Sequence, residues 1–359
     1  MYSPKRRFRL FRALGPPAPP SGSGASILGF ARSLATTYLG FSTVPTDGGA
    51  LTINSQSVGG YELTTRSGDT TISSFTASDW FTSTKDTTSS WIVVNGNLTI
   101  NAGQTIIPAV RKLFTVVYVT GDLICNGGIS MTARGANHSG TGDSGGAVTP
   151  ANILIGSGTF SAVTNPQIPA TGGAGASGTN VDNVVVNGTA GSAGGSGGGG
   201  AGGKFSGSGS SGGGAAGTCF SGGPGGGGML GSASNAQSGG ANGGKGGNAL
   251  GSVSAGGSGN PGGTGTGGAN GPDGNSGTGG TLIVIVGGTL SGTGSIQANG
   301  VAGARASGQV GGGGSGGGSV SVLFGTDSSS INPTATGGAG SACGSGGNGT
   351  ARKLAIGAN

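Results

Sequence analysis

The chain has 359 residues, of which 92 are glycine, while charged residues make up 7% and aromatic residues 5%. So low a charge excludes disorder caused by charge repulsion, and so few large side chains exclude an ordinary hydrophobic core along the whole chain. The formal charge of +6 comes mostly from an N-terminal cluster. The rest of the chain is nearly neutral, which excludes general nucleic-acid binding by that part.

Residues 1–45 are predicted to form a basic, Pro-rich arm that attaches the protein to a larger particle. A short helix is expected within residues 27–39, and its length and Arg32 exclude a membrane span. The acid-free start up to Asp47 also fits an organelle transit peptide, which is the alternative interpretation. The candidate attachment residues are Lys5, Arg6, Arg7, Arg9, Arg12, Ile27, Leu28, Ala31, Leu34 and Tyr38.

Residues 46–112 are rich in Thr and Ser and are predicted to form a β region. Trp80, Phe81 and Trp91 form its dense aromatic group, which we expect to be core, with carbohydrate stacking as the alternative. Residues 113–359 are predicted to form a glycine-rich body. Four β-branched runs are strand candidates, at residues 90–125, 181–187, 281–290 and 319–324.

A weak internal repeat joins two of these runs. TVVYVTGDLI at 115–124 and TLIVIVGGTL at 281–290 share an apolar strand, a glycine turn and a second short strand. Alignment of the two copies, including the residues that follow each segment, needs one small gap. WIVVNGNLTI at 91–100 repeats the first half, and SVSVLFG at 319–325 repeats it more loosely. Each unit has too little apolar surface to be stable alone, so the units are expected to stack on one another.

Between residues 191 and 280 the chain places 42 glycines in 90 positions. Such a segment either stays disordered or orders itself through backbone hydrogen bonds. Neighbouring tracts in an extended three-residue helix can bond backbone to backbone, because no Cβ separates them. The predicted fold class is therefore all-β, with short strands in a repetitive stack alternating with polyglycine II-like tracts, preceded by an extended arm with a short helix.

The segments VVYVTGDLICNGGISMTARGA, TLIVIVGGTLSGTGSIQANG and GGGGSGGGSVSVLF resemble the glycine-rich distal parts of bacteriophage tail fibres and adhesins, over residues 90–356. In that family glycine tracts can form a polyglycine II sandwich whose end loops bind the host receptor. The resemblance implies a virion protein with a receptor-binding body. The candidate receptor contacts are the large side chains of the glycine field, Lys204, Phe205, Phe220, Met229, Leu230 and Lys245, with packing between glycine layers as the alternative for Phe and Leu.

Motifs of enzymes are present but lack the context that their chemistry needs. GDSGG at 142–146 matches the nucleophile sequence of trypsin-like proteases, yet His138 is the one histidine and lies on the same expected loop. Gly-Lys pairs at Lys204 and Lys245 have no following Ser or Thr, as a phosphate loop requires. Scattered acids offer no paired carboxylates beside an aromatic platform. We therefore expect no enzyme, no cofactor, no metal site and no small-molecule substrate.

The three cysteines, Cys125, Cys219 and Cys343, are too few and too far apart for a disulfide framework or a zinc site. No export signal follows the basic start, so we expect synthesis in a host cytoplasm and assembly into a virion. The predicted function is a tail-fibre or adhesin-like subunit, a homotrimer that contacts other virion proteins through its arm and a host receptor through its body. A capsid decoration or head-fibre protein without receptor binding is the alternative, and a free cell-surface or ice-binding protein is a second one.

Overall fold

The computed structural model describes residues 50–53, 56–84, 88–135, 190, 192, 217, 220–223, 225, 277–303, 313–340 and 344–355. Within these ranges the chain is all-β, as predicted, with one 3₁₀ turn at Ala77–Asp79. The strands are β1 (Ala50–Ile53), β2 (Gln56–Ser67), β3 (Thr70–Ile72), β4 (Thr88–Asn95), β5 (Leu98–Ile100), β6 (Thr105–Ile106), β7 (Thr115–Val119), β8 (Leu123–Cys125), β9 (Gly128–Ser130), β10 (Thr281–Ser291), β11 (Ser295–Gln297), β12 (Ser319–Asp327) and β13 (Thr350–Ala355).

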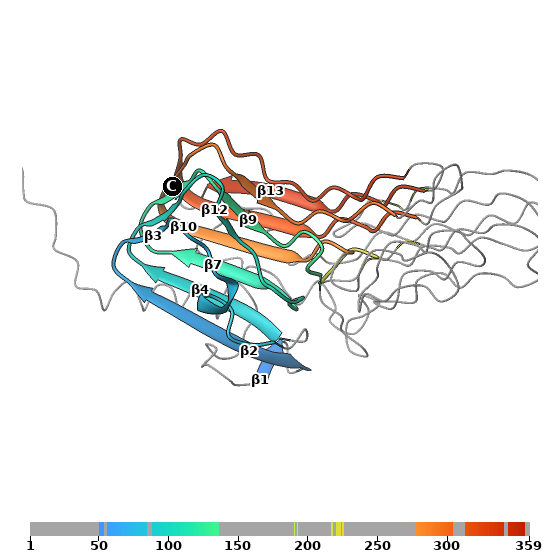
Figure 1. Ribbon diagram of the computed structural model, residues 1–359, viewed down its shortest axis with the longest axis horizontal. Coiled ribbons are helices and arrows are strands. Elements are labelled where there is room, and N and C mark those ends of the chain that lie inside the picture. The colour runs from blue at the N-terminus through green and yellow to red at the C-terminus, as the bar shows by residue number, and fades with distance from the viewer. Residues whose placement is uncertain are drawn as a thin grey trace, which may run out of the picture.

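Almost all strand pairs are parallel, and the chain winds as a solenoid whose successive turns stack (Figure 1). The first face holds β2, β4, β7, β13 and the first parts of β10 and β12. The second face holds β3, β5, β8 and the ends of β10 and β12. The third face holds β6, β9 and β11. The antiparallel pair in the described part of the chain is β1 with β2, at the N-terminal end.

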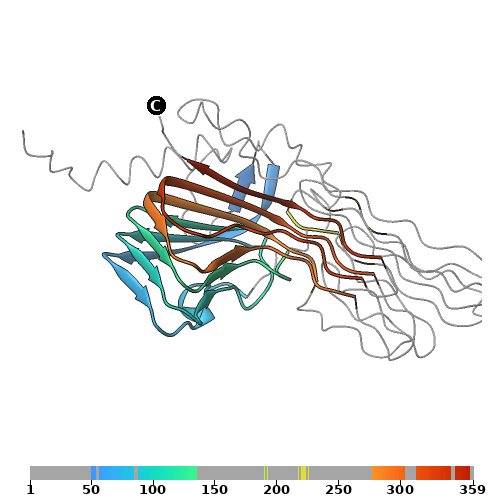
Figure 2. The same cartoon turned by 90° about the horizontal axis from the view of Figure 1, so that it is seen from above.

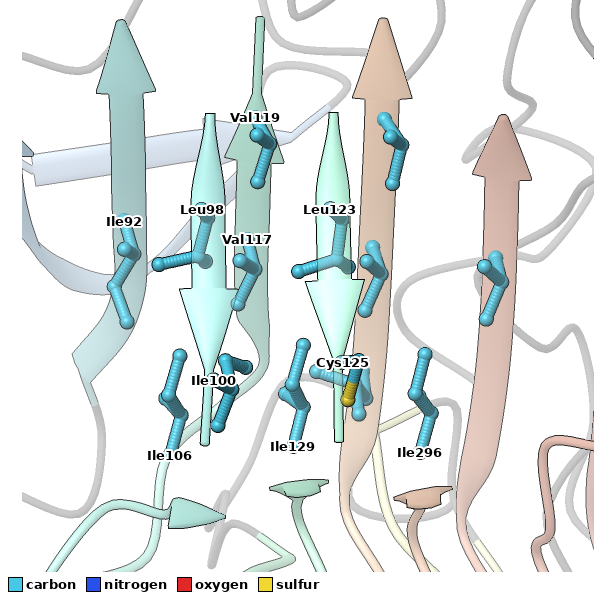
Figure 3. Close-up of a cluster of buried hydrophobic side chains, with 14 of the residues drawn as sticks. Ile92, Leu98, Ile100, Ile106, Val117, Val119, Leu123, Cys125, Ile129 and Ile296 are labelled. Carbon is cyan, nitrogen blue, oxygen red and sulfur yellow. The ribbon is translucent and has the colours of Figure 1, made fainter. Parts of the chain in front are cut away.

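The core lies between the faces and consists of columns of apolar side chains, one per solenoid turn. Leu98 pairs with Leu123 and Leu123 with Leu290 on the second face. Ile129 pairs with both Ile106 and Ile296 on the third face. Figure 3 shows Leu98 and Leu123 of the second face and Ile106, Ile129 and Ile296 of the third face meeting between the strands. Because the inward position alternates with period two, a shift of one residue would turn every column outward, which fixes the register.

The repeat found in the sequence corresponds to stacked neighbours. Val119 lies beside Val286, and Leu123 beside Leu290, so β7–β8 and β10 align without the gap that the sequence comparison introduced. The looser copies also stack, with β4 on one side of β7 and β12 on the far side of β10. Strands from both sides of residue 112 belong to the same ten-stranded sheet.

Residues 136–276, here called the insertion, separate two turns that are adjacent in space. The N–H of Gly135 donates to the carbonyl of Thr278 at 3.0 Å, so both ends of the insertion lie at one place on the solenoid. The strand candidate at 181–187 falls within the insertion and lies outside the described residues. The same holds for the attachment arm and its expected helix.

The N-terminal end of the core is closed by aromatic side chains, as expected. Trp80 and Phe81 are both buried in the core cluster. The Thr64 hydroxyl donates to the Trp80 carbonyl at 3.0 Å, and the Arg66 guanidinium lies 5.0 Å from the Trp80 ring centroid. Trp91 is buried as well, on the outward side of β4. None of the three rings is exposed enough to serve as a platform for carbohydrate stacking.

Candidate functional site

Six glycine-rich tracts lie side by side beyond the end of the sheet and are here called the glycine bundle. They comprise 220–225, 277–280, 298–301, 313–318, 335–338 and 344–349. Three of them run directly into β10, β12 and β13. Figure 2 shows the orange and red tracts lying side by side as they leave the sheet.

Backbone hydrogen bonds join the tracts in more than one direction. The central tract, 313–318, exchanges hydrogen bonds with all five others, among them Gly316 N–H to the Gly223 carbonyl at 2.7 Å and Gly279 N–H to the Gly316 carbonyl at 3.1 Å. On another side Gly317 N–H donates to the Gly347 carbonyl at 3.0 Å. A β-sheet bonds each strand to two neighbours in one plane, whereas this tract has five neighbours around it.

The close approach of these backbones requires glycine. A Cβ built on Gly317 would lie 2.1 Å from the Ala335 carbonyl oxygen, and one on Gly346 would lie 2.0 Å from the Ser315 oxygen. On Gly222 it would lie 2.0 Å from the Gly316 oxygen. The obstructing atoms are backbone, which cannot rotate away as a side chain can. The glycines of the bundle are therefore needed for space and not only for flexibility.

The receptor-contact candidate Phe220 is fully buried, which corrects its expected role and favours the packing alternative. Its ring stacks on Phe114 with centroids 6.4 Å apart and an interplanar angle of 16°, and Phe114 meets Trp91 edge-on at 6.1 Å. The Thr281 hydroxyl donates to the Phe220 carbonyl at 3.0 Å. The other contact candidates, Lys204, Phe205, Met229, Leu230 and Lys245, lie outside the described residues.

The corner between the first and second faces carries a ladder of short polar side chains. Asp69 Oδ1 accepts the Asn97 N–H at 2.9 Å, Asn97 Oδ1 accepts the Asp122 N–H at 2.8 Å, and Asp122 Oδ1 accepts the Thr289 N–H at 2.7 Å. Each ladder residue follows a glycine, and a Cβ on Gly121 would lie 2.3 Å from Asn97 Oδ1. The ladder thus satisfies backbone groups of one turn with side chains of the turn before it. The Asp122 carboxylate is thus engaged in a structural hydrogen bond.

The outward side of the second face presents a regular surface of short side chains. The register stacks five turns there, each with three outward positions, and all fifteen residues are exposed or partly exposed. Ile124, at 38% exposure, is the large exposed hydrophobic residue among those described. The surface consists of Asp69, Thr71, Ser73, Asn97, Thr99, Asn101, Asp122, Ile124, Asn126, Thr289, Ser291, Thr293, Thr326, Ser328 and Ser330.

A buried ion pair links β2 to the segment before β7. Lys112 Nζ lies 2.8 Å from Glu62 Oε1, and the two side chains are 0% and 3% exposed. The Glu62 carboxylate also accepts hydrogen bonds from the Ser90 hydroxyl, the Ser83 N–H and the Thr82 hydroxyl, and Lys112 donates to the Ser83 carbonyl at 2.6 Å. Such saturation with partners is what allows two charges to lie inside a protein.

The C-terminal end of the core is closed by Lys353 from β13. Its Nζ lies 5.9 Å from the Phe324 ring centroid, forms an ion pair with Asp327, and donates to the Ile331 carbonyl at 2.9 Å. Burial acts to raise the pKa of Asp327, but the hydrogen bonds from Lys353 and Ser329 outweigh it and hold this pKa below its ordinary value. The β13 edge is therefore occupied by charge, a common protection of edge strands against aggregation.

Replacement of Asp327 by Asn is expected to lower the free energy of unfolding by about 0.5–1 kcal/mol at pH 7, the value typical of a partly exposed ion pair. A carboxylate whose folded pKa is depressed stabilises the fold above its unfolded pKa of about 3.9, and this contribution disappears as the pH falls through the folded pKa. Chemical denaturation of both proteins from pH 7 down to acid would measure this. A difference between them that stays constant over the whole range would contradict the assignment.

Burial shifts the pKa values of three further titratable groups. Burial raises the pKa of Cys125 to about 12, so its thiol stays protonated and unreactive near neutral pH. Burial also raises the pKa of Tyr118 and lowers that of Arg134, whose Nε donates to the Pro108 carbonyl at 2.7 Å. His138 and the GDSGG segment lie outside the described residues.

Sequence reasoning missed several structural residues. It did not find the ladder of Asp69, Asn97 and Asp122, although a Gly-Asp or Gly-Asn step recurs after the first-face strands β2, β4 and β7 and could have revealed it. It also missed Lys112, because nothing local distinguishes a buried lysine from an exposed one.

Within the described residues no cluster of three or more His, Cys, Asp or Glu side chains could hold a metal ion. The same part of the chain contains no helix long and apolar enough to cross a membrane. Comparisons of the chain with protein-family models, with curated proteins and with solved structures found no match.

Proposed function

We propose that this chain is a structural, non-enzymatic virion protein, a tail-fibre or adhesin-like subunit that projects a glycine-rich body. The observation that carries the proposal is the glycine bundle, whose tracts lie beyond the strands of a parallel solenoid and are joined mainly by backbone hydrogen bonds. Such a bundle offers few side chains for chemistry but a stiff extension for display. The resemblance of residues 90–356 to phage tail fibres supports the same proposal, a structural virion protein.

We further propose that the bundle is of the polyglycine II type and that it extends into the insertion. The five tracts that surround tract 313–318 support this proposal, since an extended tract without internal hydrogen bonds must find hydrogen-bond partners on several sides. A packed bundle without loose chain also resists proteases. A virion protein outside the cell benefits from this resistance.

The solenoid itself supplies a surface that a host glycan could contact. The outward side of the second face repeats short hydroxyl, amide and carboxylate groups at the strand spacing of about 4.8 Å. These groups suit hydroxyl-rich partners, because both sides can donate and accept hydrogen bonds. Together with the insertion's Lys204, Phe205, Met229, Leu230 and Lys245, this face is the proposed contact region, while the basic arm would attach to the particle.

Labelling the chain in purified particles tests the proposal. We expect the label on tails or their fibres. A label confined to heads would overturn the fibre assignment in favour of capsid decoration, and the protein on uninfected cells would overturn the virion role altogether. Mass measurement of the purified protein tests assembly separately: a trimer is expected, and a monomer would contradict it.

A further inference from the structure

We propose that Phe220 is a positioning residue that sets the register of tract 220–225 within the glycine bundle. Glycine tracts lack side chains, so neighbouring tracts could slide along one another and still form the same number of hydrogen bonds. A register must therefore come from groups outside the repeating backbone.

Five of the six tracts take their register from the solenoid. Tracts 277–280 and 313–318 run into β10 and β12, whose side chains belong to the core cluster, and tract 344–349 runs into β13, which pairs with β12. Tract 298–301 follows β11, and tract 335–338 follows Thr334, which bridges to Gln297. Tract 220–225 differs, because no described strand adjoins it in sequence.

The contacts of Phe220 and Ser221 hold tract 220–225 in one register. The Phe220 ring stacks on Phe114 and is 0% exposed, and its carbonyl accepts the Thr281 hydroxyl. Ser221 forms an antiparallel bridge with Gly280, beside the point where β10 begins. A slide of the tract by one residue would remove the ring from its place beside Phe114.

Phe220 thereby fixes tract 220–225 on the solenoid, far in sequence from Gly135, whose N–H donates to the Thr278 carbonyl. The contact candidates Lys204, Phe205, Met229, Leu230 and Lys245 lie outside the described residues. This role of Phe220 does not depend on the virion assignment, because it concerns the purified chain.

A disulfide trap reports the register directly. Ser221 Cβ and Thr278 Oγ1 each lie 2.6 Å from the position that a Cβ on Gly135 would occupy, so their side chains converge there. The Thr278 hydroxyl has no hydrogen-bond partner in the described part of the chain, so its replacement is mild. The full chain would carry Ser221→Cys and Thr278→Cys, with Cys219→Ser and Cys343→Ser to remove competing thiols.

Oxidation of this protein is expected to form the 221–278 disulfide, and adding Phe220→Ala is expected to lower its rate on the order of tenfold or more, as loss of a buried ring allows other registers. Phe220→Leu should restore part of the rate. Phe75→Ala, which removes a partly buried ring packed on the core elsewhere, is the matched control and should leave the rate unchanged.

An unchanged rate in Phe220→Ala would overturn the proposal, and so would an equal loss in the Phe75→Ala control, since that loss would reflect general destabilisation. If Phe220→Ala does not fold, Phe220→Leu takes its place. A slower rate in that variant, with hydrogen exchange of β4 to β9 unchanged, supports the proposal, and an unchanged rate overturns it.

Discussion

Gly317→Ala is expected to destabilise the protein by about 3 kcal/mol, at the upper end of the cost of overpacking. The added Cβ would lie 2.1 Å from the Ala335 carbonyl oxygen and 2.6 Å from its carbon. Relief would require the tract to move, and Gly317 N–H would then lose its bond to the Gly347 carbonyl. Denaturant or thermal unfolding monitored by circular dichroism would measure the change.

Gly128→Ala is the matched control, because the same methyl group meets side chains there instead of backbone. The nearest atoms are hydroxyl oxygens of Ser295 and Thr105, both at 3.1 Å, which can rotate away. Gly128 is buried, but rotation of these hydroxyl groups relieves the contacts, so the cost is expected to stay below about 1 kcal/mol, the lower end of the cost of overpacking. Equal stabilities of the two variants would show that the glycine bundle is not close-packed.

Lys112→Met is expected to cost about 3–5 kcal/mol, because it leaves the Glu62 carboxylate buried without its counter-charge. The hydroxyl and amide donors around Glu62 remain, but none carries a positive charge. Unfolding measurements near neutral pH test this. The double variant Glu62→Gln, Lys112→Met should lose less than the sum of the two single variants, since it removes both charges.

Lys353→Met provides the comparison at the opposite end of the solenoid. The Lys353–Asp327 pair is 19% and 24% exposed, so water screens the charge that remains. Its loss should cost about 1 kcal/mol or less. If the two lysine variants were equally stable, burial would not be what makes the Lys112 pair important.

The parallel winding could not be read from the sequence, although the strands could. The runs at 281–290 and 319–324 correspond to β10 and β12. Their partners, however, come at irregular distances along the chain, and the insertion separates β9 from β10. A fixed period, which is the usual signature of a solenoid, is therefore absent.

In the candidate site, too, some residues could not be identified from the sequence. No local sequence pattern indicates that Lys112 and Phe220 are buried. Lys112 pairs with Glu62 and Phe220 stacks on Phe114, and both partners lie far away in the chain. The ladder residue Asp69 belongs to a first turn that was not recognised as a copy of the repeat, since TTI at β3 is more polar than LTI at β5. Tertiary contacts outweigh such weak local signals.

The sequence was enough to predict that the described residues are all-β, and that glycine segments, where ordered, bond through their backbones. The reason is local: β-branched runs favour strands, and a segment without side chains has only its N–H and carbonyl groups to offer. Only the tertiary structure decided which tract lies beside which and which large side chains are buried. Those choices depend on register between residues distant in the chain, which the core columns of the solenoid fix and no local pattern encodes.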